Sequence, residues 1–424
     1  MRICIITAGG AGMFCGSCMQ DNTLVRSLRM AGADALLLPT YTPVRVDEDN
    51  ASSTQVFMGG INVYLDSKLP GWRLLPDWCR SWLDRPGVVS FLSRFSSSTS
   101  AAQLGPLTVD LLKGSSGPQR REIEALVKYL ALELKPDVIV LSNALISGIV
   151  PELRRQWHGQ LACLIQGDDI FLKDLPAPWQ TAAIQKITEN CRQIDMFLTH
   201  SSYYSDHMSQ LLQLPPRKFH TIPLAVQPPP ATPTATPNSP TTQRHIGYFA
   251  RICPEKGAFR FLDAAAQLLP QNPSLRMSIG GFLPALHQKQ FQQRFNAAAK
   301  GCEQQLLWLG SPSTREEKFQ LLSQFDWLCV PAEYREPKGL YVLEAALLGI
   351  PSLLPAHGAF PERLQMLQHG KLYPPDTPLA DAIRSLPPNL SPQERQNLSS
   401  RCLEFCGMQQ AGQAVLTTLS TPAN

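Results

Sequence analysis

Short apolar runs alternate with amphipathic stretches along most of the chain, a pattern typical of parallel strands joined by helices. The run "RICIITA" (residues 2–8) predicts a buried strand that ends in glycines, and "ALLLP" (residues 35–39) predicts the next strand. Between them lies a helical pattern, for which Asp21 or Asn22 is the expected N-terminal cap. Together these elements predict a βαβ unit with a glycine-rich turn at the carboxyl end of its first strand.

The same rhythm predicts three more strands before residue 224, at "VIVL" (138–141), "LACLI" (161–165) and "MFLTH" (196–200). An insert at residues 72–117, rich in Ser, Gly and Pro, interrupts the pattern. We expect this insert to be irregular and its "SSSTS" (residues 96–100) to form a mobile loop.

A proline-rich segment, "QPPPATPTATPNSPTTQ" (residues 227–243), predicts an extended linker, because proline lacks a backbone donor and disfavours helix in its neighbour. After it the rhythm restarts, with strands predicted at "HIGYFA", "LRMSIGG", "LLWLG", "WLCVP" and "SLLPA". The predicted parts are an N-terminal domain at 1–224, a linker at 225–243, a C-terminal domain at 244–405 and a last segment at 406–424.

The chain has 424 residues, more than one ordinary hydrophobic core holds, so two domains are expected. The predicted fold class is α/β, with two Rossmann-like doubly wound domains facing a cleft. Ligands of such sheets bind at the carboxyl ends of the strands.

The composition limits which binding partners and which cellular compartment we expect for this protein. A net charge of +4 and the lack of a long Lys/Arg run predict no nucleic-acid partner. The apolar run at the N-terminus is too short for a signal peptide, and no stretch approaches ~18 uncharged apolar residues. We expect a cytoplasmic protein, with peripheral contact to a membrane left open.

The 11 cysteines are odd in number, and several stand in apolar runs, which favours buried thiols over a disulfide framework. Cys15 and Cys18 form a C-x-x-C, which redox chemistry or half of a zinc site would also use. The spacing of Cys402 and Cys406 is not that of the usual second half of a zinc site. No metal site is predicted.

Glycines at positions 9, 10, 12 and 16 follow the first strand. The dinucleotide fingerprint fails because Cys15 stands where its last glycine belongs, and the P-loop fails because Ser17 stands in place of its lysine. What remains is a bare turn where Gly10 and Gly12 let an anion or a sugar approach the backbone. A tight turn with no ligand explains the pattern equally well.

The motif "ARICPEKG" places Arg251 at the end of the first strand after the linker and Lys256 just before the next helix. Two cations at a strand–loop–helix edge suit a diphosphate. The alternative is a solvated pair of surface cations.

The stretch "YREPKGLYVLEAALLGIP" predicts a helix that starts near Leu340 and ends at Gly349. The first amides of a helix lack intrahelical acceptors, so those of Gly339, Leu340 and Tyr341 are candidates to bind phosphate oxygens.

Two glutamates, seven residues apart, flank this predicted helix start. Glu344 lies about one turn inside, where its carboxylate would accept hydrogen bonds from ribose hydroxyls. Glu336 would face the sugar, because a carboxylate beside a phosphate site is costly unless it binds hydroxyls or offsets developing positive charge. The alternative is a helix with two solvated glutamates.

In combination, Arg251, Lys256 and the E-x7-E motif followed by "AALLGIP" resemble the retaining nucleotide-sugar glycosyltransferases of family four, which have the GT-B fold. The similarity spans most of the chain, since the glycine turn, "KPDVIVLSNAL", "SSYYSDHM" and "GYFARICPEKG" follow in the family's order.

The resemblance implies a hexosyltransferase that uses a UDP- or GDP-sugar donor, retains the anomeric configuration and needs neither metal nor cofactor. It implies that Arg251 and Lys256 stabilise the leaving diphosphate, that Glu344 binds ribose and that Glu336 binds the donor sugar, so that Glu336, Arg251 and Lys256 are the catalytic residues. The donor would bind the C-terminal domain, with Gly10 and Gly12 approaching it from the other domain.

The resemblance further implies that the N-terminal domain holds a glycan, lipid or small-molecule acceptor, with Asn143, Gln166 and Asp168 as substrate-binding residues. Gln166 stands where family members often have a histidine, so it would donate a hydrogen bond to a sugar hydroxyl but could not titrate. Lys338 stands where an aromatic or apolar residue is more usual. The final helix is expected to cross back to the N-terminal domain.

Three other interpretations compete with this one. Residues 47–49 ("DED") match the Asp-x-Asp of metal-dependent transferases, but they lie in the wrong half of the chain. A nucleotide-dependent oxidoreductase is disfavoured by the failed dinucleotide fingerprint. A non-catalytic sugar-nucleotide-binding relative is disfavoured by the retained cations and glutamates.

Overall fold

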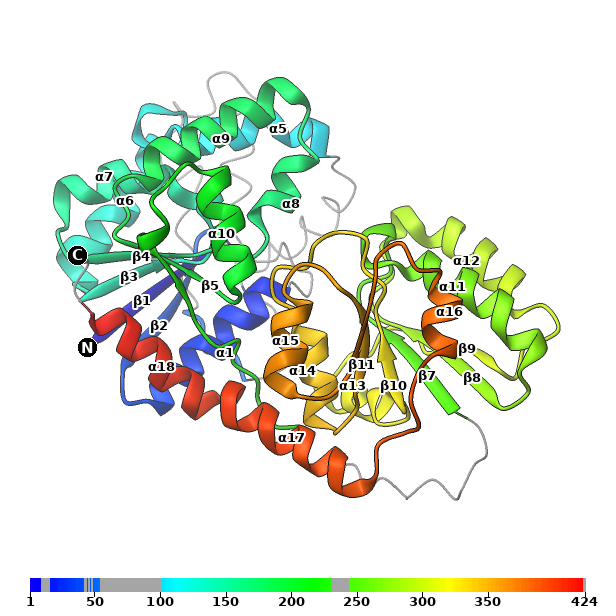
Figure 1. Cartoon of the computed structure of the whole chain (residues 1–424). Coiled ribbons are helices and arrows are strands. Elements are labelled where there is room, and N and C mark those ends of the chain that lie inside the picture. The colour runs from blue at the N-terminus through cyan, green and yellow to red at the C-terminus, as the bar shows by residue number, and fades with distance from the viewer. Residues whose placement is uncertain are drawn as a thin grey trace. The chain divides into compact units, whose positions relative to one another are not determined.

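The computed structural model describes residues 1–8, 16–41, 44, 46, 49–53, 101–230 and 244–421. The chain divides into two compact units: unit 1 is Met1–Ala225 with Met408–Asn424, and unit 2 is Val226–Gly407. Each unit contains a six-stranded parallel sheet with helices packed on it (Figure 1). This confirms the predicted α/β class with two Rossmann-like sheets, while the cleft stays a prediction.

The sheet of unit 1 has the strand order β2-β1-β3-β4-β5-β6, and every neighbouring pair is parallel. Its strands are β1 (Arg2–Thr7), β2 (Asp34–Pro39), β3 (Val138–Leu141), β4 (Gln160–Leu164), β5 (Met196–Thr199) and β6 (Phe219–Thr221). The strands β3 and β5 are buried along their whole length, as expected of a sheet covered on both faces.

The helices of unit 1 include α1, α9 and α10, and short helical turns connect several of them. Their bounds are α1 (Gly16–Met30), α5 (Ala101–Leu112), η2 (Gly114–Ser116), α6 (Arg120–Lys128), η3 (Tyr129–Leu134), η4 (Ala144–Ile149), α7 (Val150–Gln156), α8 (Asp168–Lys173), α9 (Ala177–Cys191), α10 (Ser202–Leu211), η5 (Pro216–Lys218) and α18 (Met408–Ser420).

The sheet of unit 2 has the order β12-β11-β10-β7-β8-β9, again all parallel. Its first strand in sequence therefore lies in the middle, and the strand order reverses between β7 and β10. Its strands are β7 (Arg244–Phe249), β8 (Leu275–Gly280), β9 (Leu306–Trp308), β10 (Trp327–Cys329), β11 (Ser352–Pro355) and β12 (Lys371–Tyr373). In a doubly wound sheet, this reversal is where a ligand site forms.

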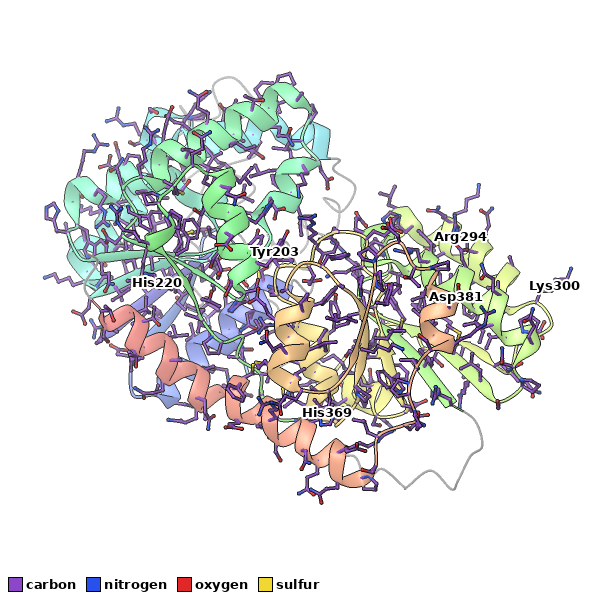
Figure 2. All side chains as sticks on the ribbon, viewed as in Figure 1. Tyr203, His220, Arg294, Lys300, His369 and Asp381 are labelled. Carbon is purple, nitrogen blue, oxygen red and sulfur yellow. The ribbon has the colours of Figure 1, made fainter. Side chains whose placement is uncertain are left out.

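The helices of unit 2 connect these strands in turn, and charged side chains such as Arg294 and Lys300 of the α12 region are exposed to solvent (Figure 2). Their bounds are η6 (Pro254–Lys256), α11 (Ala258–Leu268), η7 (Leu269–Gln271), α12 (Ala285–Ala299), α13 (Arg315–Leu322), α14 (Leu340–Leu347), α15 (Phe360–Leu367), α16 (Leu379–Arg384) and α17 (Pro392–Cys406).

The end of the chain forms two helices rather than one, because the backbone leaves the helical conformation at Gly407. Helix α18 packs along α1 of unit 1 (Figure 1). The contact is close: a side-chain carbon added at Gly412 would lie 2.1 Å from the carbonyl oxygen of Ser27. Glycine at this position therefore lets the two helix backbones approach each other.

Two local predictions were wrong, and two strands were missed. Helix α1 begins at Gly16, so Asp21 and Asn22 lie inside it and are buried rather than capping it. The insert is not irregular throughout, since α5 occupies residues 101–112. Strands β6 and β12 were not predicted, because their three residues mix polar and apolar side chains, unlike those of the equally short β9 and β10. The "SSSTS" prediction falls at residues 96–100, outside the described residues.

Among the described residues, no helix has both the length and the apolar content needed to cross a membrane.

Candidate functional site

The loops that follow β7 and β10 meet where the strand order of unit 2 reverses. The first loop carries Arg251 and Lys256, and the second carries Glu336. Gly257, with a positive φ of 74°, lets the loops touch, since a side-chain carbon there would lie 1.9 Å from the carbonyl oxygen of Pro331. Residues far apart in the sequence thus come together at the carboxyl edge of the sheet.

Glu336 lies at the centre of this edge and is only 2% exposed. Its Oε2 atom accepts hydrogen bonds from Lys256 Nζ (2.6 Å), the Tyr334 hydroxyl (2.7 Å) and the Tyr341 hydroxyl (2.9 Å). Its Oε1 atom accepts one from the backbone N–H of Gly339 (3.2 Å). The predicted sugar-binding carboxylate is therefore held by four donors of unit 2.

These donors decide the charge of Glu336. Burial alone raises the pKa of a carboxyl group, but the Lys256 ammonium and the three side-chain hydrogen bonds outweigh burial and lower the pKa of Glu336 to about 2. Burial and the neighbouring carboxylate raise the pKa of Tyr334 and Tyr341 well above 10. At neutral pH the carboxylate is ionised and both phenols are protonated.

Helix α14 begins next to this carboxylate. Gly339 has a positive φ of 69° and caps the helix, so its N–H points back to Glu336. Leu340 and Tyr341 are the first residues of the helix, and their amides lack the intrahelical acceptors that later amides have. Arg363 of α15, itself buried, donates from Nε to the carbonyl oxygen of Lys338 (2.8 Å) and thereby fixes the turn before the helix.

Glu344 lies in the middle of α14 and forms an ion pair with Lys318 of α13. Their Nζ and Oε1 atoms are 3.0 Å apart, and the two side chains are 9% and 13% exposed, Lys318 being the lower. One oxygen of Glu344 is thus engaged with a lysine that the sequence did not single out. The predicted contact of Glu344 with ribose stays a prediction.

Arg251 is the exposed cation of the site. Its carbonyl oxygen accepts a hydrogen bond from the buried hydroxyl of Tyr248 (2.9 Å), which anchors the loop after β7. The positive charge of its guanidinium group favours a lower pKa of Tyr334, against the larger effects of burial and Glu336. Arg251 is therefore close to the pair that Tyr334 forms with Glu336. The structure therefore brings Arg251, Lys256, Glu336 and the start of α14 to one place.

In unit 1, Gln166 follows β4 and is buried. Its amide nitrogen donates to Asp21 Oδ1 (2.7 Å) and to the carbonyl oxygen of Ser142 (3.2 Å). Asp21 also accepts a hydrogen bond from Thr7 at the end of β1 (2.8 Å). Both donors of Gln166 are thus occupied within unit 1, and a bond to a sugar hydroxyl would have to replace one of them.

Asp168 is also buried, and its carboxylate accepts the backbone N–H groups of Ala144 and Gln166. Burial raises the pKa of Asp168 to about 6, against the opposing effect of these amides. The neighbouring Asp169 has the reverse shift, because hydrogen bonds from His207, Lys173 and Tyr204 lower its pKa despite burial.

Asn143 follows β3, and its Oδ1 atom is buried without a hydrogen-bond partner among the described residues. This is the one predicted acceptor-side residue with an unused polar atom in the described part of unit 1. Gly10 and Gly12 lie outside the described residues, as do Cys15 and residues 47–48 of the Asp-x-Asp string.

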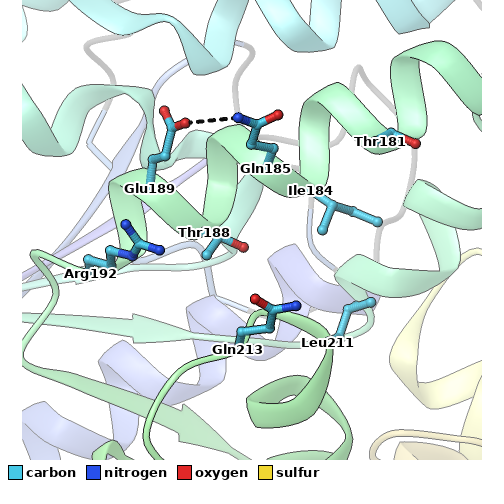
Figure 3. A pocket seen from close by; sticks show the side chains of 8 residues that line it. All are labelled: Thr181, Ile184, Gln185, Thr188, Glu189, Arg192, Leu211 and Gln213. Carbon is cyan, nitrogen blue, oxygen red and sulfur yellow. Dashed lines mark hydrogen bonds between the residues drawn. The ribbon is translucent and has the colours of Figure 1, made fainter.

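A surface hollow of about 500 Å³ lies on unit 1, away from these residues (Figure 3). It is lined by Ile184 and Glu189 of α9 and by Leu211 at the end of α10, among others. It contains none of the predicted site residues, and its wall carries no cluster of catalytic groups.

Sequence reasoning missed three parts of the site: the hydroxyls of Tyr334 and Tyr341, the ion-pair partner Lys318, and the buried Arg363. Tyr341 had been singled out for its amide alone. The only signal was that tyrosines stand two residues before and five residues after Glu336. Nothing in the sequence indicates that Lys318 meets Glu344 across 26 residues.

Residues 234–401 match the family model described as glycosyl transferases group 1. This segment contains all the strands of unit 2 and the residues Arg251, Lys256, Glu336 and Glu344. No curated protein sequence matches the chain.

Solved structures with a similar fold cover nearly the whole chain. Sucrose-phosphate synthase from Thermosynechococcus elongatus has a TM-score of 0.67 at 16% identity, covering 99% of this chain and 98% of that one. Anabaena HepE in complex with UDP and glucose has a TM-score of 0.62 at 14% identity, covering 99% of both chains. The trehalose-6-phosphate synthase OtsA has a TM-score of 0.65 at 14% identity, covering 100% of this chain and 99% of that one.

At these identities the likeness concerns the fold, and it confirms the predicted GT-B architecture. The group 1 match confirms that the chain is a glycosyltransferase. Membership in family four, retention of configuration and independence of metal stay predictions.

Proposed function

We propose that the protein transfers a hexosyl group from a nucleoside-diphosphate sugar to a hydroxyl-bearing acceptor, with retention of the anomeric configuration and without a metal. The observation that carries this proposal is the convergence of Arg251, Lys256, Glu336 and the first turn of α14 at the point of strand reversal. This set combines two cations, a buried anion and helix-start amides, which matches the charges of a sugar diphosphate.

In this proposal the diphosphate binds at the start of α14, between Arg251 and Lys256. The amides of Leu340 and Tyr341 and the positive end of the helix favour its negative charge. The two cations stabilise the diphosphate as it leaves, which is the role that a divalent metal has in metal-dependent transferases. Bond breaking at the anomeric carbon leaves the electron pair on the phosphate oxygen.

Glu336 has a different task. Positive charge develops on the sugar ring as the diphosphate leaves, and an ionised carboxylate nearby stabilises it. Because Glu336 is buried and held by four donors, it keeps one orientation instead of turning toward solvent. A direct contact with sugar hydroxyls would require one of those donors to give way.

Glu344 is proposed to bind the ribose hydroxyls through the oxygen that Lys318 does not hold. Both residues come from helices of unit 2, so the nucleoside and the diphosphate would bind the same unit. The UDP named in the Anabaena HepE structure favours a uridine nucleotide among the donor candidates, with GDP as the alternative.

The acceptor is proposed to bind unit 1, where Asn143 offers an unused carbonyl oxygen to a hydroxyl group. A glycan, a lipid headgroup or a small molecule with hydroxyls would all satisfy it. Two enzymes of similar fold are named as synthases of sucrose phosphate and of trehalose 6-phosphate, and these sugar products favour a sugar acceptor for this chain.

Calorimetry with UDP and GDP tests the donor site. The wild-type protein should bind one of them, and Lys256→Ala should weaken binding by about 1.5–3 kcal/mol, the range for a hydrogen bond to a charged group. Asp263→Ala is the matched control, because Asp263 is an exposed α11 residue paired only with Arg294 among the described residues. Unchanged affinity in Lys256→Ala would remove Lys256 from the site.

Turnover tests the chemistry. Hydrolysis of, or transfer from, UDP- and GDP-sugars should persist in excess chelator, and the anomer released first should keep the donor configuration by proton NMR. Glu336→Ala should abolish turnover. Full loss of activity in chelator, restored by Mg²⁺, would replace the metal-independent mechanism with a metal-dependent one.

A further inference from the structure

Two tyrosine side chains that the proposed mechanism does not use surround its central ion pair. Tyr334 lies in the loop after β10, and Tyr341 lies in the first turn of α14. Both hydroxyls donate to the same atom, Glu336 Oε2, at 2.7 and 2.9 Å. Lys256 donates to that atom as well and also to the Tyr334 hydroxyl.

The aromatic rings of both tyrosines also contact Lys256. The Lys256 ammonium lies 4.8 Å from the centre of the Tyr334 ring and 4.9 Å from that of Tyr341. Both distances are within the range in which an aromatic ring attracts a cation. The ammonium is thus bounded by two rings and a carboxylate, and these three partners come from segments about 80 residues away in the sequence.

This arrangement leaves Lys256 one donor. An ammonium has three N–H groups, of which one binds Glu336 and one binds Tyr334. Among the described residues the third has no acceptor. Because the ammonium is confined by its neighbours, the direction of this third N–H is fixed before any phosphate arrives.

We infer that Tyr334 and Tyr341 are positioning residues, which hold Lys256 and Glu336 in a single geometry for the donor diphosphate. The inference rests on the proposed function for what binds there. Groups held in place beforehand need not reorganise when the ligand binds or when charge develops, and both affinity and rate benefit from this. Neither tyrosine is expected to touch the reacting atoms.

Several charged and polar groups around Glu336 influence its pKa. Lys256 faces it from the loop after β7, Tyr334 and Tyr341 from the β10–α14 segment, and the buried Arg363 from α15. Replacing the tyrosines by phenylalanine keeps the rings and both cations. Glu336 loses its two hydroxyl donors, and Lys256 loses the Tyr334 hydroxyl as an acceptor. The pKa of Glu336 should therefore rise from about 2, by about one unit for each lost donor.

The test uses the full-length protein with Tyr334→Phe, Tyr341→Phe and the double variant. Tyr373→Phe is the matched control, because Tyr373 of β12 is a buried tyrosine of the same unit and its hydroxyl has no hydrogen-bond partner among the described residues. The titration of Glu336 is followed by ¹³C NMR of labelled glutamate carboxyls, with the resonance identified by its loss in Glu336→Gln.

In the double variant, Glu336 should titrate between about pH 3.5 and 5, whereas wild type and Tyr373→Phe should show no titration above pH 3.5. Calorimetry at pH 7.5 should show the affinity for UDP or GDP reduced at least fivefold in the double variant and unchanged in Tyr373→Phe. An unchanged titration, or a shifted titration with full nucleotide affinity, would overturn the positioning role.

The donor site and the positioning role of the tyrosines can fail separately in these experiments. If the wild-type protein binds neither UDP nor GDP, the proposed function fails, and the positioning role for a donor fails with it. If wild type binds a nucleotide and the double variant binds it equally well, the proposed function stands and only the role of the tyrosines is wrong.

Discussion

Both units bury a carboxylate just beyond the carboxyl end of a parallel strand, yet the two carboxylates behave in opposite ways. Glu336 of unit 2 is 2% exposed and has its pKa lowered to about 2. Asp168 of unit 1 is 4% exposed and has its pKa raised to about 6. Burial is nearly equal, so burial does not account for the difference.

The difference lies in the partners. Glu336 has a cation and two phenol hydroxyls within hydrogen-bond distance. The hydrogen-bond donors to Asp168 among the described residues are backbone amides, and a second carboxylate, Asp169, lies nearby. A lysine stabilises the ionised form far more than an amide dipole does. The surroundings of Glu336 keep a negative charge in the interior of unit 2, and the surroundings of Asp168 do not do so in unit 1, where the cationic partners bind Asp169 instead.

Removing the cation should make Glu336 resemble Asp168, and this is the largest effect we expect. Lys256→Met leaves a buried carboxylate without its ion-pair partner, and breaking a buried pair in this way costs about 3–5 kcal/mol of stability. Urea denaturation at pH 7, monitored by far-UV circular dichroism, measures the loss of stability.

The double variant Lys256→Met/Glu336→Gln is the control, because it removes both charges together. It should recover most of the stability lost in Lys256→Met. If the single and double variants were equally unstable, the loss would come from the packing of the lysine stem between the tyrosine rings rather than from the stranded charge.

The second expected effect is that Asp168 and Glu336 make the stability of the protein depend on pH in opposite directions. The pKa of Asp168 rises from 3.8 to about 6 on folding, so the folded protein binds this proton more tightly, and stability falls as the pH increases from about 4 to 6. The pKa of Glu336 falls from 4.5 to about 2, so its contribution is present above pH 4.5 and is lost as the pH decreases toward 2. Each contribution is on the order of 3 kcal/mol.

Denaturation curves at pH 4 and pH 7 isolate the Asp168 term when wild type is compared with Asp168→Asn. Asp168→Asn should lose less stability than wild type between these two pH values, by about 2–3 kcal/mol. Asp174→Asn changes an exposed carboxylate at the C-terminal end of the same helix, α8, and should follow wild type. Parallel curves for wild type and Asp168→Asn would mean that Asp168 is not protonated in the folded protein at low pH.

Most of the strands in both sheets can be predicted from the sequence. Uniformly apolar runs predict buried parallel strands well, which is why five strands of each sheet were expected. The missing ones, β6 and β12, read "FHT" and "KLY", too short and too mixed to stand out from a loop. The cap predicted at Asp21 or Asn22 failed because α1 extends back to Gly16, which puts a polar face inside unit 1.

The sequence predicts which loops carry the site, but it does not predict which side chains of those loops bind each other. The order of strands in a doubly wound sheet brings the ends of β7 and β10 together, so Arg251, Lys256 and Glu336 could be grouped from the sequence. The pairing of side chains depends on how the loops pack. Gly358, for example, lies so close to Glu336 that an added side-chain carbon would be 2.6 Å from its nitrogen. No spacing rule encodes such a contact.

Glu344 provides the intermediate case and the smallest expected effect. It is paired with a lysine, as Glu336 is, but it has no phenol donors among its described contacts and remains 13% exposed. Lys318→Met should leave Glu344 free to change rotamer, at a smaller cost in stability than Lys256→Met because Glu344 reaches solvent more readily than Glu336. The affinity for UDP or GDP should fall about tenfold, or about 1.4 kcal/mol. Lys318→Arg, which keeps the charge, should retain most of the affinity in the same calorimetric titration. The contradicting outcome is that Lys318→Met binds nucleotide as wild type does while Glu344→Gln does not. In that case the backbone of α14 alone would orient Glu344. A partner cation would then be needed to hold the fully buried Glu336 but not Glu344.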